Sequence, residues 1–374
     1  MGEHVLVTGG AGFVGSHLVD ALIAGGHEVR IFDSLEPQVH GQDRQVPPHV
    51  NPGAELVRGS VTDAEAVARV LDGIDVVFHH AAAVGVGQSM YDIVHYCHAN
   101  TVGAAVLLQE IVKRRSRIRK MVVASSMSVY GEGAYRTPGG KARSPRLRTR
   151  DRLERGEWEM RDGATGVPLE PIPTPETKPL QPTSVYAITK RDHEELFLTV
   201  GYAYRIPTVA LRYFNIYGER QALSNPYTGV AAIFSTRVLN GQAPMMFEDG
   251  EQSRDFIHVS DVVRANLLAL ETDRADYEAL NVGTGQPTTI RQVADAILET
   301  LGRTDLKPCV LGTFREGDIR HCYADISRAR DLLGYAPEVT FNDGVRRLVE
   351  WVRGQQAVDG FDQAHRQLVE RGLA

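Results

Sequence analysis

Short apolar runs alternate with amphipathic stretches through the first half of the chain. Five β-prone runs predict strands at His4–Thr8, Glu28–Asp33, Val76–His79, Met121–Ser125 and Thr208–Tyr213. Apolar residues at helical spacing lie between them, at Gly15–Gly25, Asp63–Leu71, Ala99–Lys113 and Ser184–Tyr202. Strands that alternate with helices favour right-handed crossovers and a parallel sheet covered on both faces. We therefore predict a doubly wound α/β fold.

The second half of the chain is predicted to add a smaller α/β unit. From Asn215 onward the chain alternates between completing the sheet and building this unit, whose helices include Arg291–Leu301 and Asp343–Arg353. We accordingly divide the chain into a first domain, residues 1–214, and a mainly substrate-binding domain, residues 215–374, with returns to the sheet around residues 255–284.

Composition excludes several classes of partner. The net charge of -6 gives no reason to expect a nucleic-acid partner, because such partners bind a concentrated basic face. No apolar run approaches the ~20 residues of a membrane helix, and no secretion signal precedes the first strand, so we expect a cytoplasmic protein. The three cysteines, Cys97, Cys309 and Cys322, lie far apart, which favours neither a disulfide framework nor a metal site.

A glycine-rich turn follows the first predicted strand. In TGGAGFVG, Gly9, Gly12 and Gly15 allow a tight turn, a close approach to a pyrophosphate, and close packing of helix on strand. The helix that begins around Phe13 and Val14 offers unpaired N–H groups to the phosphates. The order of strand, turn and helix indicates a Rossmann-type dinucleotide site rather than an ordinary glycine turn.

Asp33 ends the second predicted strand. A carboxylate there can accept hydrogen bonds from both ribose hydroxyls of an adenosine and repels a 2′-phosphate. No arginine follows immediately to offset that repulsion. The cofactor is therefore expected to be NAD rather than NADP.

Candidate catalytic groups lie on a strand end and a helix. Tyr186 and Lys190 form Y-x-x-x-K, and their spacing places both on one helix face. A nearby ammonium stabilises a phenolate, so the pair predicts a tyrosine whose pKa falls from ~10 toward neutral and which takes a proton from a sugar hydroxyl. Ser125 and Ser126 follow a strand at the sheet edge where such folds bind ligands.

These motifs together resemble the extended short-chain dehydrogenases/reductases, and specifically the NAD-dependent sugar-nucleotide epimerase/dehydratase family. The resemblance runs from about Val5 to Trp351 and includes FHHAAA, SSMSVYG, LRYFNIYG, RDFIHVSD and NVGTG. It implies that Ser126 is the catalytic hydroxyl and that Tyr186 and Lys190 act as base and modulator. It also implies cofactor contacts and substrate-diphosphate contacts. The expected cofactor contacts, beyond the glycine turn and Asp33, are Ser60, Val61, Ala81, Ala82, Asn100, Tyr186 and Lys190. The expected substrate contacts are Ser126, Asn215, Arg254, Arg315 and Arg320.

The residues after Ser126 narrow the reaction. A 4,6-dehydratase of this family places an Asp-Glu pair there, whereas Met127 and Ser128 cannot do acid–base work. We therefore expect a 4-epimerase that passes through a 4-keto sugar. Within the family the segment AAAVGVGQSMYDIVHYCHANT most resembles dTDP-L-rhamnose 4-epimerases. A UDP-hexose or UDP-hexuronate 4-epimerase, a 4-ketoreductase or dehydrogenase, and a non-catalytic sensor stay open as alternatives.

Two expectations concern assembly and the segment Glu132–Pro182. The resemblance implies a homodimer through a four-helix bundle made by Ala99–Lys113 and Ser184–Tyr202. Glu132–Pro182 is rich in Arg, Pro and Gly, shows little periodicity, and separates Ser126 from Tyr186. It is interpreted either as a solvated loop or as a lid or dimer arm near the active-site mouth. It contains no Cys or His, so zinc is not expected there.

Overall fold

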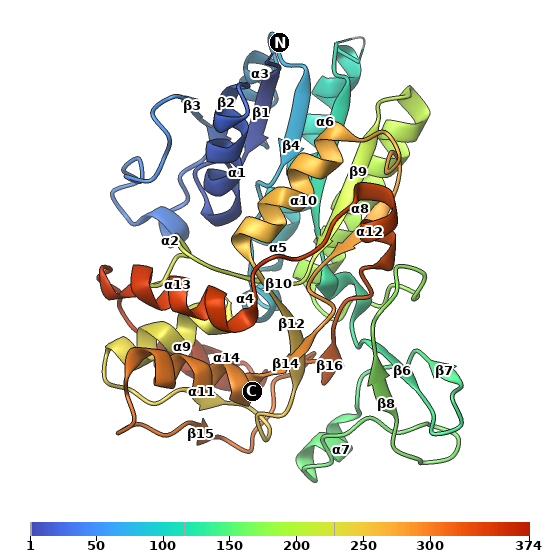
Figure 1. The fold of residues 1–374 in the computed structure, drawn as a ribbon, viewed down its shortest axis with the longest axis vertical. Coiled ribbons are helices and arrows are strands. Elements are labelled where there is room, and N and C mark those ends of the chain that lie inside the picture. Colours follow the sequence, from blue (N-terminus) through green and yellow to red (C-terminus); the bar gives the residue numbers. More distant parts are fainter. Residues whose placement is uncertain (1, 116, 228) are drawn as a thin grey trace.

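A seven-stranded parallel sheet organises the computed structural model, which describes residues 2–115, 117–227 and 229–374 (Figure 1). Its order is β13-β9-β5-β4-β1-β2-β3. The strands are β1 (His4–Thr8), β2 (Glu28–Asp33), β3 (Glu55–Arg58), β4 (Val76–His79), β5 (Lys120–Ser126), β9 (Thr208–Tyr213) and β13 (Ala279–Val282). All neighbouring pairs are parallel, which confirms the predicted fold class. The short strand β3 was not predicted, whereas β13 lies within the predicted return to the sheet around residues 255–284.

Helices cover both faces of this sheet. On one face, which is nearer the viewer in Figure 1, lie α1 (Phe13–Ala24), α10 (Val259–Glu271) and α12 (Ser327–Leu333). On the other lie α3 (Ala64–Val70), α6 (Gly103–Lys113) and α8 (Val185–Tyr204). Successive residues of β1 point to opposite faces, so Val5 and Val7 enter the first core and Leu6 the second.

Helix caps set several boundaries. The Asp63 carboxylate accepts hydrogen bonds from the N–H groups of Glu65 and Ala66, so it caps α3 as such a residue does at a helix start. The Ser184 hydroxyl caps α8 through the Ala187 N–H. The stretch expected as one α-helix from Ala99 to Lys113 instead begins as a π-helix, η1 (Cys97–Val102), before α6.

A second unit lies below the sheet in Figure 1. It contains β10 (Asn215–Tyr217), β11 (Met245–Met246), β12 (Ser253–His258), β14 (Pro287–Thr289), β15 (Cys309–Val310), β16 (His321–Cys322), α9 (Val230–Leu239), α11 (Ile290–Leu301), α13 (Phe341–Arg353) and α14 (Phe361–Glu370). Apolar residues of α9, α11 and α13 form its core. The chain returns to the first core at α10 and β13, and a further time at α12.

The insert Glu132–Pro182 is folded rather than structureless. It forms the sheet β7-β6-β8 from β6 (Ala134–Arg136), β7 (Ala142–Arg143) and β8 (Glu170–Ile172), together with α7 (Arg150–Glu154). Tyr135, Met160 and Leu169 make a small buried cluster of its own. It lies beside the second unit at the lower right of Figure 1. The expectation that the segment is structureless is therefore wrong, although much of its surface is exposed.

Four short elements complete the description. These are α2 (Pro37–His40), α4 (Val86–Ser89), α5 (Ile93–Tyr96) and the 3-10 helix η2 (Met127–Tyr130). Within the ranges described above, no helix is both long and apolar enough to cross a membrane.

Candidate active site

The glycine turn has the geometry that a dinucleotide requires. Gly9 has a φ of +70°, and a Cβ there would lie 2.7 Å from the Ala81 nitrogen. A Cβ on Gly15 would lie 2.2 Å from the Gly9 carbonyl oxygen. Gly12 caps α1 without a side chain, so the N–H groups of the first turn, at Phe13 and Val14, are not covered by any described side-chain cap. These exposed donors suit a pyrophosphate.

Asp33 holds this turn in place from the end of β2. Its Oδ2 accepts a hydrogen bond from the Ala11 N–H at 3.0 Å, and its Oδ1 accepts one from the Leu35 N–H at 2.9 Å. A carboxylate has about four acceptor positions, so two backbone contacts leave capacity for ribose hydroxyls. Ser60 and Val61 follow the neighbouring strand β3, whose Gly59 N–H donates to the Asp33 carbonyl at 2.9 Å.

Asn100 fixes the segment that carries Ala81 and Ala82. Its buried Oδ1 accepts a hydrogen bond from the Ala83 N–H at 2.7 Å, and its Nδ2 donates to the Ala83 carbonyl at 3.0 Å. Nδ2 also donates to Thr189 Oγ1 at 2.9 Å. Asn100 therefore joins the end of β4 to α8, the helix that carries Tyr186 and Lys190.

The serine pair separates into two roles. Ser125 is buried and its hydroxyl donates to Glu194 at 2.8 Å. Ser126 is half-buried and lies near enough to the Tyr186 phenol to lower its pKa. Its Oγ also accepts from the Ser128 N–H at 3.2 Å and lies 2.9 Å from the Ser128 hydroxyl. Of the two serines, Ser126 is the one placed to meet a substrate beside Tyr186.

Burial dominates the protonation of the catalytic pair. It raises the pKa of Tyr186 to about 12, and the hydrogen bond from Ser126 opposes this shift. Burial also lowers the pKa of Lys190 to about 7. The Lys190 Nζ donates to the Ala124 carbonyl at 3.0 Å. The expectation that Lys190 brings the Tyr186 pKa toward neutral is wrong for this arrangement, because burial raises that pKa and Lys190 is not among the groups that shift it.

Three imidazoles surround Lys190, and no local motif revealed all of them. His79 lies 2.8 Å from Thr8 Oγ1 and stacks on Phe197, and burial lowers its pKa to about 3. Burial likewise lowers the pKa of His80 to about 3 and holds the pKa of His193 well below its usual value. Uncharged rings thus surround the ammonium and increase its desolvation.

A cavity of about 310 Å³ lies between the segment that follows Ser126 and the second unit. Near Ser126 it is lined by Met127 and Ser128, and by Val86 and Met90 of the segment after β4. Thr183 and Ser184, just before α8, complete that side.

Three of the predicted substrate-binding residues line the cavity, and a fourth does not. Asn215, Arg254 and Arg315 line the cavity. The Arg254 guanidinium donates to the Ile319 carbonyl at 2.6 Å, and the Arg315 guanidinium lies 4.6 Å from the centre of the Phe247 ring. Arg320 is not among the lining residues. Its side chain is 1% exposed and donates to three carboxylates, so the structure does not place it at a substrate diphosphate.

Helix α14 forms a wall of the same cavity that the sequence pattern did not predict. Phe361, Ala364, His365 and Leu368 line it. The His365 Nδ1 is buried and has no hydrogen-bond partner among the described residues. The hydroxyl of Tyr227, which also lines the cavity, donates to Gln367 at 2.7 Å and ties α14 to the rest of the second unit.

Comparison with known proteins identifies the family. The chain matches the model of the NAD dependent epimerase/dehydratase family over residues 5–151 and 164–283, and the interruption lies inside the insert. The chain belongs to this family. These matches confirm three predictions: the family, the NAD cofactor and the assignment as an epimerase. Members of the family act on nucleotide sugars.

Individual members of the NAD-dependent epimerase/dehydratase family match nearly the whole chain. A dTDP-L-rhamnose 4-epimerase of Burkholderia thailandensis is 34% identical over 94% of this chain and 95% of its own. The Thermotoga maritima UDP-glucose 4-epimerase with UDP-glucose has a TM-score of 0.76 and 33% identity, covering 94% of this chain and 98% of that one. The Thermus thermophilus UDP-glucose 4-epimerase with NAD has a TM-score of 0.74 and 31% identity, covering 94% of this chain and 100% of that one.

Proposed function

We propose that the protein is a nucleotide-sugar 4-epimerase whose substrate is a dTDP-6-deoxyhexose, dTDP-L-rhamnose or its C4 epimer dTDP-6-deoxy-L-talose. The observation that carries the proposal is that Ser126, which lies beside the Tyr186 phenol, is followed directly by Met127 and Ser128, and these two residues line the cavity. These two side chains offer no acid–base pair for dehydration, so the chemistry left to the site is proton exchange at one hydroxyl.

Each catalytic group has a task in this proposal. NAD, when bound, supplies reversible hydride acceptance at the sugar C4. The Tyr186 oxygen takes the 4-hydroxyl proton and returns it after the sugar has turned. Ser126 donates a hydrogen bond to the same sugar oxygen and stabilises charge that develops on it. Proton uptake needs the Tyr186 phenolate, which burial disfavours and which a protonated Lys190 on the same helix face would stabilise.

The cofactor assignments also belong to the proposal. The phosphates are held by the turn at Gly9, Gly12 and Gly15 and the N–H groups of Phe13 and Val14. Asp33, with Ser60 and Val61, holds the adenosine end. Ala81 and Ala82 lie along the cofactor, and Asn100 keeps that segment in register with α8. Asn215, Arg254 and Arg315 meet the diphosphate of the sugar nucleotide.

The lining near Ser126 supports a 6-deoxy sugar. Val86, Met90 and Met127 present apolar groups, which suit a C6 methyl. A hexuronate carboxylate would need a cation there, whereas the lining arginines, Arg254 and Arg315, are assigned to the diphosphate in this proposal. The relative from Burkholderia thailandensis is named for the same substrate.

Proton NMR of C4 inversion tests the proposal. The enzyme with NAD is incubated separately with dTDP-L-rhamnose, UDP-glucose and UDP-glucuronate, and we expect inversion of the first with no net NADH formed. Tyr186→Phe is expected to lower kcat by about 10²–10⁴-fold, because it removes the proton acceptor. Inversion of a UDP-sugar alone would replace the substrate, and net NADH turnover would favour a reductase or dehydrogenase. No inversion of any of them would refute the epimerase.

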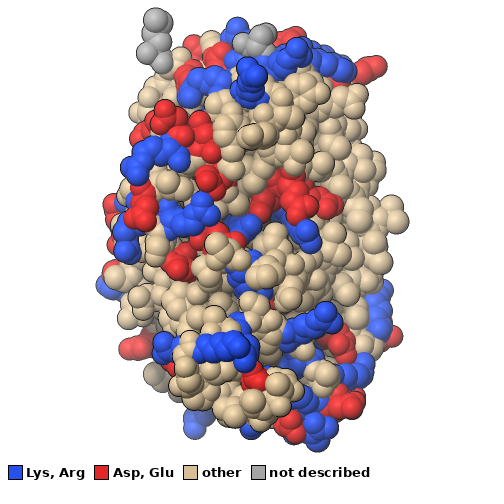
Figure 2. All heavy atoms as spheres, turned by 90° about the vertical axis from the view of Figure 1, so that its right-hand side faces the viewer, with Lys and Arg blue, Asp and Glu red and all other residues tan. Residues whose placement is uncertain are grey.

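We also propose that two copies associate through α6 and α8. An open apolar groove lies between these helices, lined by Ala105, Leu108, Gln109, Val112, Leu196, Val200 and Tyr204. Figure 2 shows the face at the right of Figure 1, where a broad area with few charged side chains lies below a basic cluster. A second copy that brings the same two helices across a twofold axis would complete a four-helix bundle and cover the groove.

Light scattering tests the assembly. The native protein is expected to be a dimer and Val200→Arg a monomer, because an arginine would be desolvated in the groove. Val369→Arg on α14, another exposed apolar position, is the matched control and should leave the mass unchanged. A monomeric native protein would contradict the proposal.

A further inference from the structure

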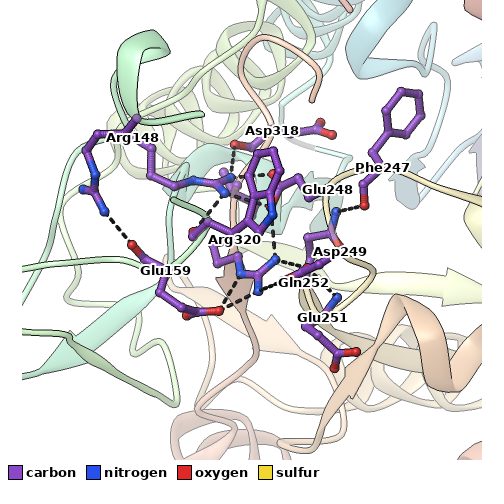
Figure 3. Close-up of polar contacts among 12 residues, drawn as sticks. Arg148, Glu159, Phe247, Glu248, Asp249, Glu251, Gln252, Asp318 and Arg320 are labelled. Atoms are coloured by element: carbon purple, nitrogen blue, oxygen red, sulfur yellow. Dashed lines mark hydrogen bonds and ion pairs between the residues drawn. The ribbon is translucent and has the colours of Figure 1, made fainter. Parts of the chain in front are cut away.

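A cluster of charged side chains, three of them buried, joins the insert to the cavity wall away from Ser126 and Tyr186 (Figure 3). Two arginines and three carboxylates take part, and we name them the arginine–carboxylate cluster: Arg148, Arg320, Glu159, Glu248 and Asp249. They come from three parts of the chain, namely the insert, the loop after β11, and the residue before β16. The proposed proton transfer uses none of them.

Arg148 is the insert's buried cation. Its Nη1 donates to Glu248 Oε2 and its Nη2 to Glu248 Oε1, each at 2.8 Å, and both side chains are 1% exposed. The same guanidinium donates to the Trp158 carbonyl at 3.0 Å and to the Asp318 carbonyl at 3.2 Å. A fork-to-fork pair of this kind specifies geometry as well as attraction.

Arg320 links the remaining carboxylates. Its Nη1 donates to Glu248 at 3.0 Å and to Asp249 at 2.6 Å. Its Nε and Nη2 donate to Glu159 Oε1 at 3.0 and 2.5 Å. Glu248 is therefore shared by both arginines, and the insert is bonded to the second unit from two sides.

The arginine–carboxylate cluster contacts two stretches of chain that also line the cavity. Phe247 lines it and directly precedes Glu248, while Asp318, whose carbonyl Arg148 holds, lines it as well. Glu248 has a φ of +53°, a left-handed conformation that is unfavourable for a residue with a side chain. The ion pairs fix this strained residue, and with it the direction of Phe247.

We propose that Arg148 and Arg320 are positioning residues that hold the wall at Phe247 and Asp318 in the shape that binds a nucleoside diphosphate. The ligand class rests on the proposed function, and the insert thereby acquires a role in binding. When Arg148 is removed, Glu248 loses its bidentate partner while still buried, and the strained loop relaxes.

Calorimetry with dTDP as the probe tests the inference. Arg148→Met is expected to weaken dTDP binding about tenfold or more, because it breaks a buried pair, and to leave NAD affinity within about twofold. Arg155→Met is the matched control in the same insert, since that exposed side chain pairs with the exposed Glu157, and dTDP affinity should not change. In turnover assays KM should rise while kcat holds, which a general loss of stability would not produce.

Glu159→Gln is a second variant that tests the inference if Arg148→Met fails to fold. Glu159 is half-exposed, so its loss should be tolerated, with dTDP binding about threefold weaker because a charge-assisted bond becomes neutral. Unchanged dTDP binding in the variants, equal weakening of dTDP and NAD, or a native protein that binds neither dTDP nor UDP would each overturn the inference. A native protein without epimerase activity whose dTDP affinity still depends on Arg148 would contradict the proposed reaction alone.

Discussion

The site has a cofactor half, at the glycine turn, Ser126, Tyr186 and Lys190, and a nucleotide-sugar half, at the cavity wall and the arginine–carboxylate cluster. The two halves stabilise their polar groups by opposite means. Around Lys190, burial removes charge: the rings of His79, His80 and His193 are neutral, and the ammonium itself titrates near pH 7. Around Glu248, buried charges persist because each is paired. The first half is built from strand ends and one helix, the second from segments far apart in the chain. Substitutions should therefore affect chemistry in the first half, and shape in the second.

The largest expected effect concerns the serine pair of the cofactor half. Ser126→Ala should lower kcat by about 10²–10³-fold with little change in stability, because it removes one donor to the developing oxyanion. Ser125→Ala is the matched change one residue away. It should cost about 1–3 kcal/mol of unfolding free energy, because Glu194 loses a buried donor, and keep kcat within a few-fold. Steady-state kinetics and urea unfolding distinguish the two serine variants. A large loss of kcat in Ser125→Ala and a loss of stability alone in Ser126→Ala would show that Ser125 is the catalytic hydroxyl.

The next effect concerns Arg320, at the centre of the other half. Arg320→Met leaves three carboxylates without their shared partner and should lower the unfolding free energy by about 3–5 kcal/mol. Arg346→Met removes an exposed pair with Asp343 and should change it by about 0–1 kcal/mol. Equal urea midpoints for the two variants would mean that the buried pairs contribute no more than surface pairs do.

The pH dependence of stability distinguishes charge removed by burial from charge kept by pairing. The pKa of Lys190 falls from 10.5 to about 7 on folding, so between those pH values the unfolded chain binds the extra proton. Stability from this group therefore rises as pH increases from about 7 toward 10.5. Lys190→Met should be more stable than the native protein at pH 7 by a few kcal/mol, on the order of 1.4 kcal/mol per pKa unit, with the difference shrinking as pH rises. Urea midpoints across this range, with the exposed Lys141→Met as control, check the slope.

The smallest expected effect lies on α14. His365→Ala removes a cavity-facing group whose Nδ1 lacks a partner among the described residues, and should raise the KM for the nucleotide sugar about fivefold, the equivalent of one hydrogen bond. Arg366→Ala, one position along and exposed, should not change it. If both variants keep the native KM, α14 bounds the cavity without contacting the ligand.

The cofactor half could be predicted because each of its parts is a local pattern. The glycine turn, the post-strand serines and the Tyr186–Lys190 spacing lie on single elements whose edges meet in a parallel sheet. The pKa of Tyr186 could not be predicted in the same way, because it depends on burial by residues distant in sequence.

Most of the nucleotide-sugar half was not predicted from the sequence. Arg320 was expected at the diphosphate, but nothing in its neighbours shows that Glu159 and Asp249 fold against it. The insert was expected to lack structure because its elements are short, and α14 was missed because no motif marks a cavity wall. Such sites depend on contacts across the chain, which periodicity does not record.

The position of α14 also has a consequence for how the protein is made. All the strands that carry the cofactor turn and the catalytic serine precede residue 127, whereas the cavity is closed only by residues 361–370. A chain leaving the ribosome can assemble its early elements first, since folding follows synthesis from the N-terminus. Until α14 emerges, this helix cannot cover Phe247 and the apolar groups beside it, so that wall stays open to chaperones and to aggregation until the end of synthesis.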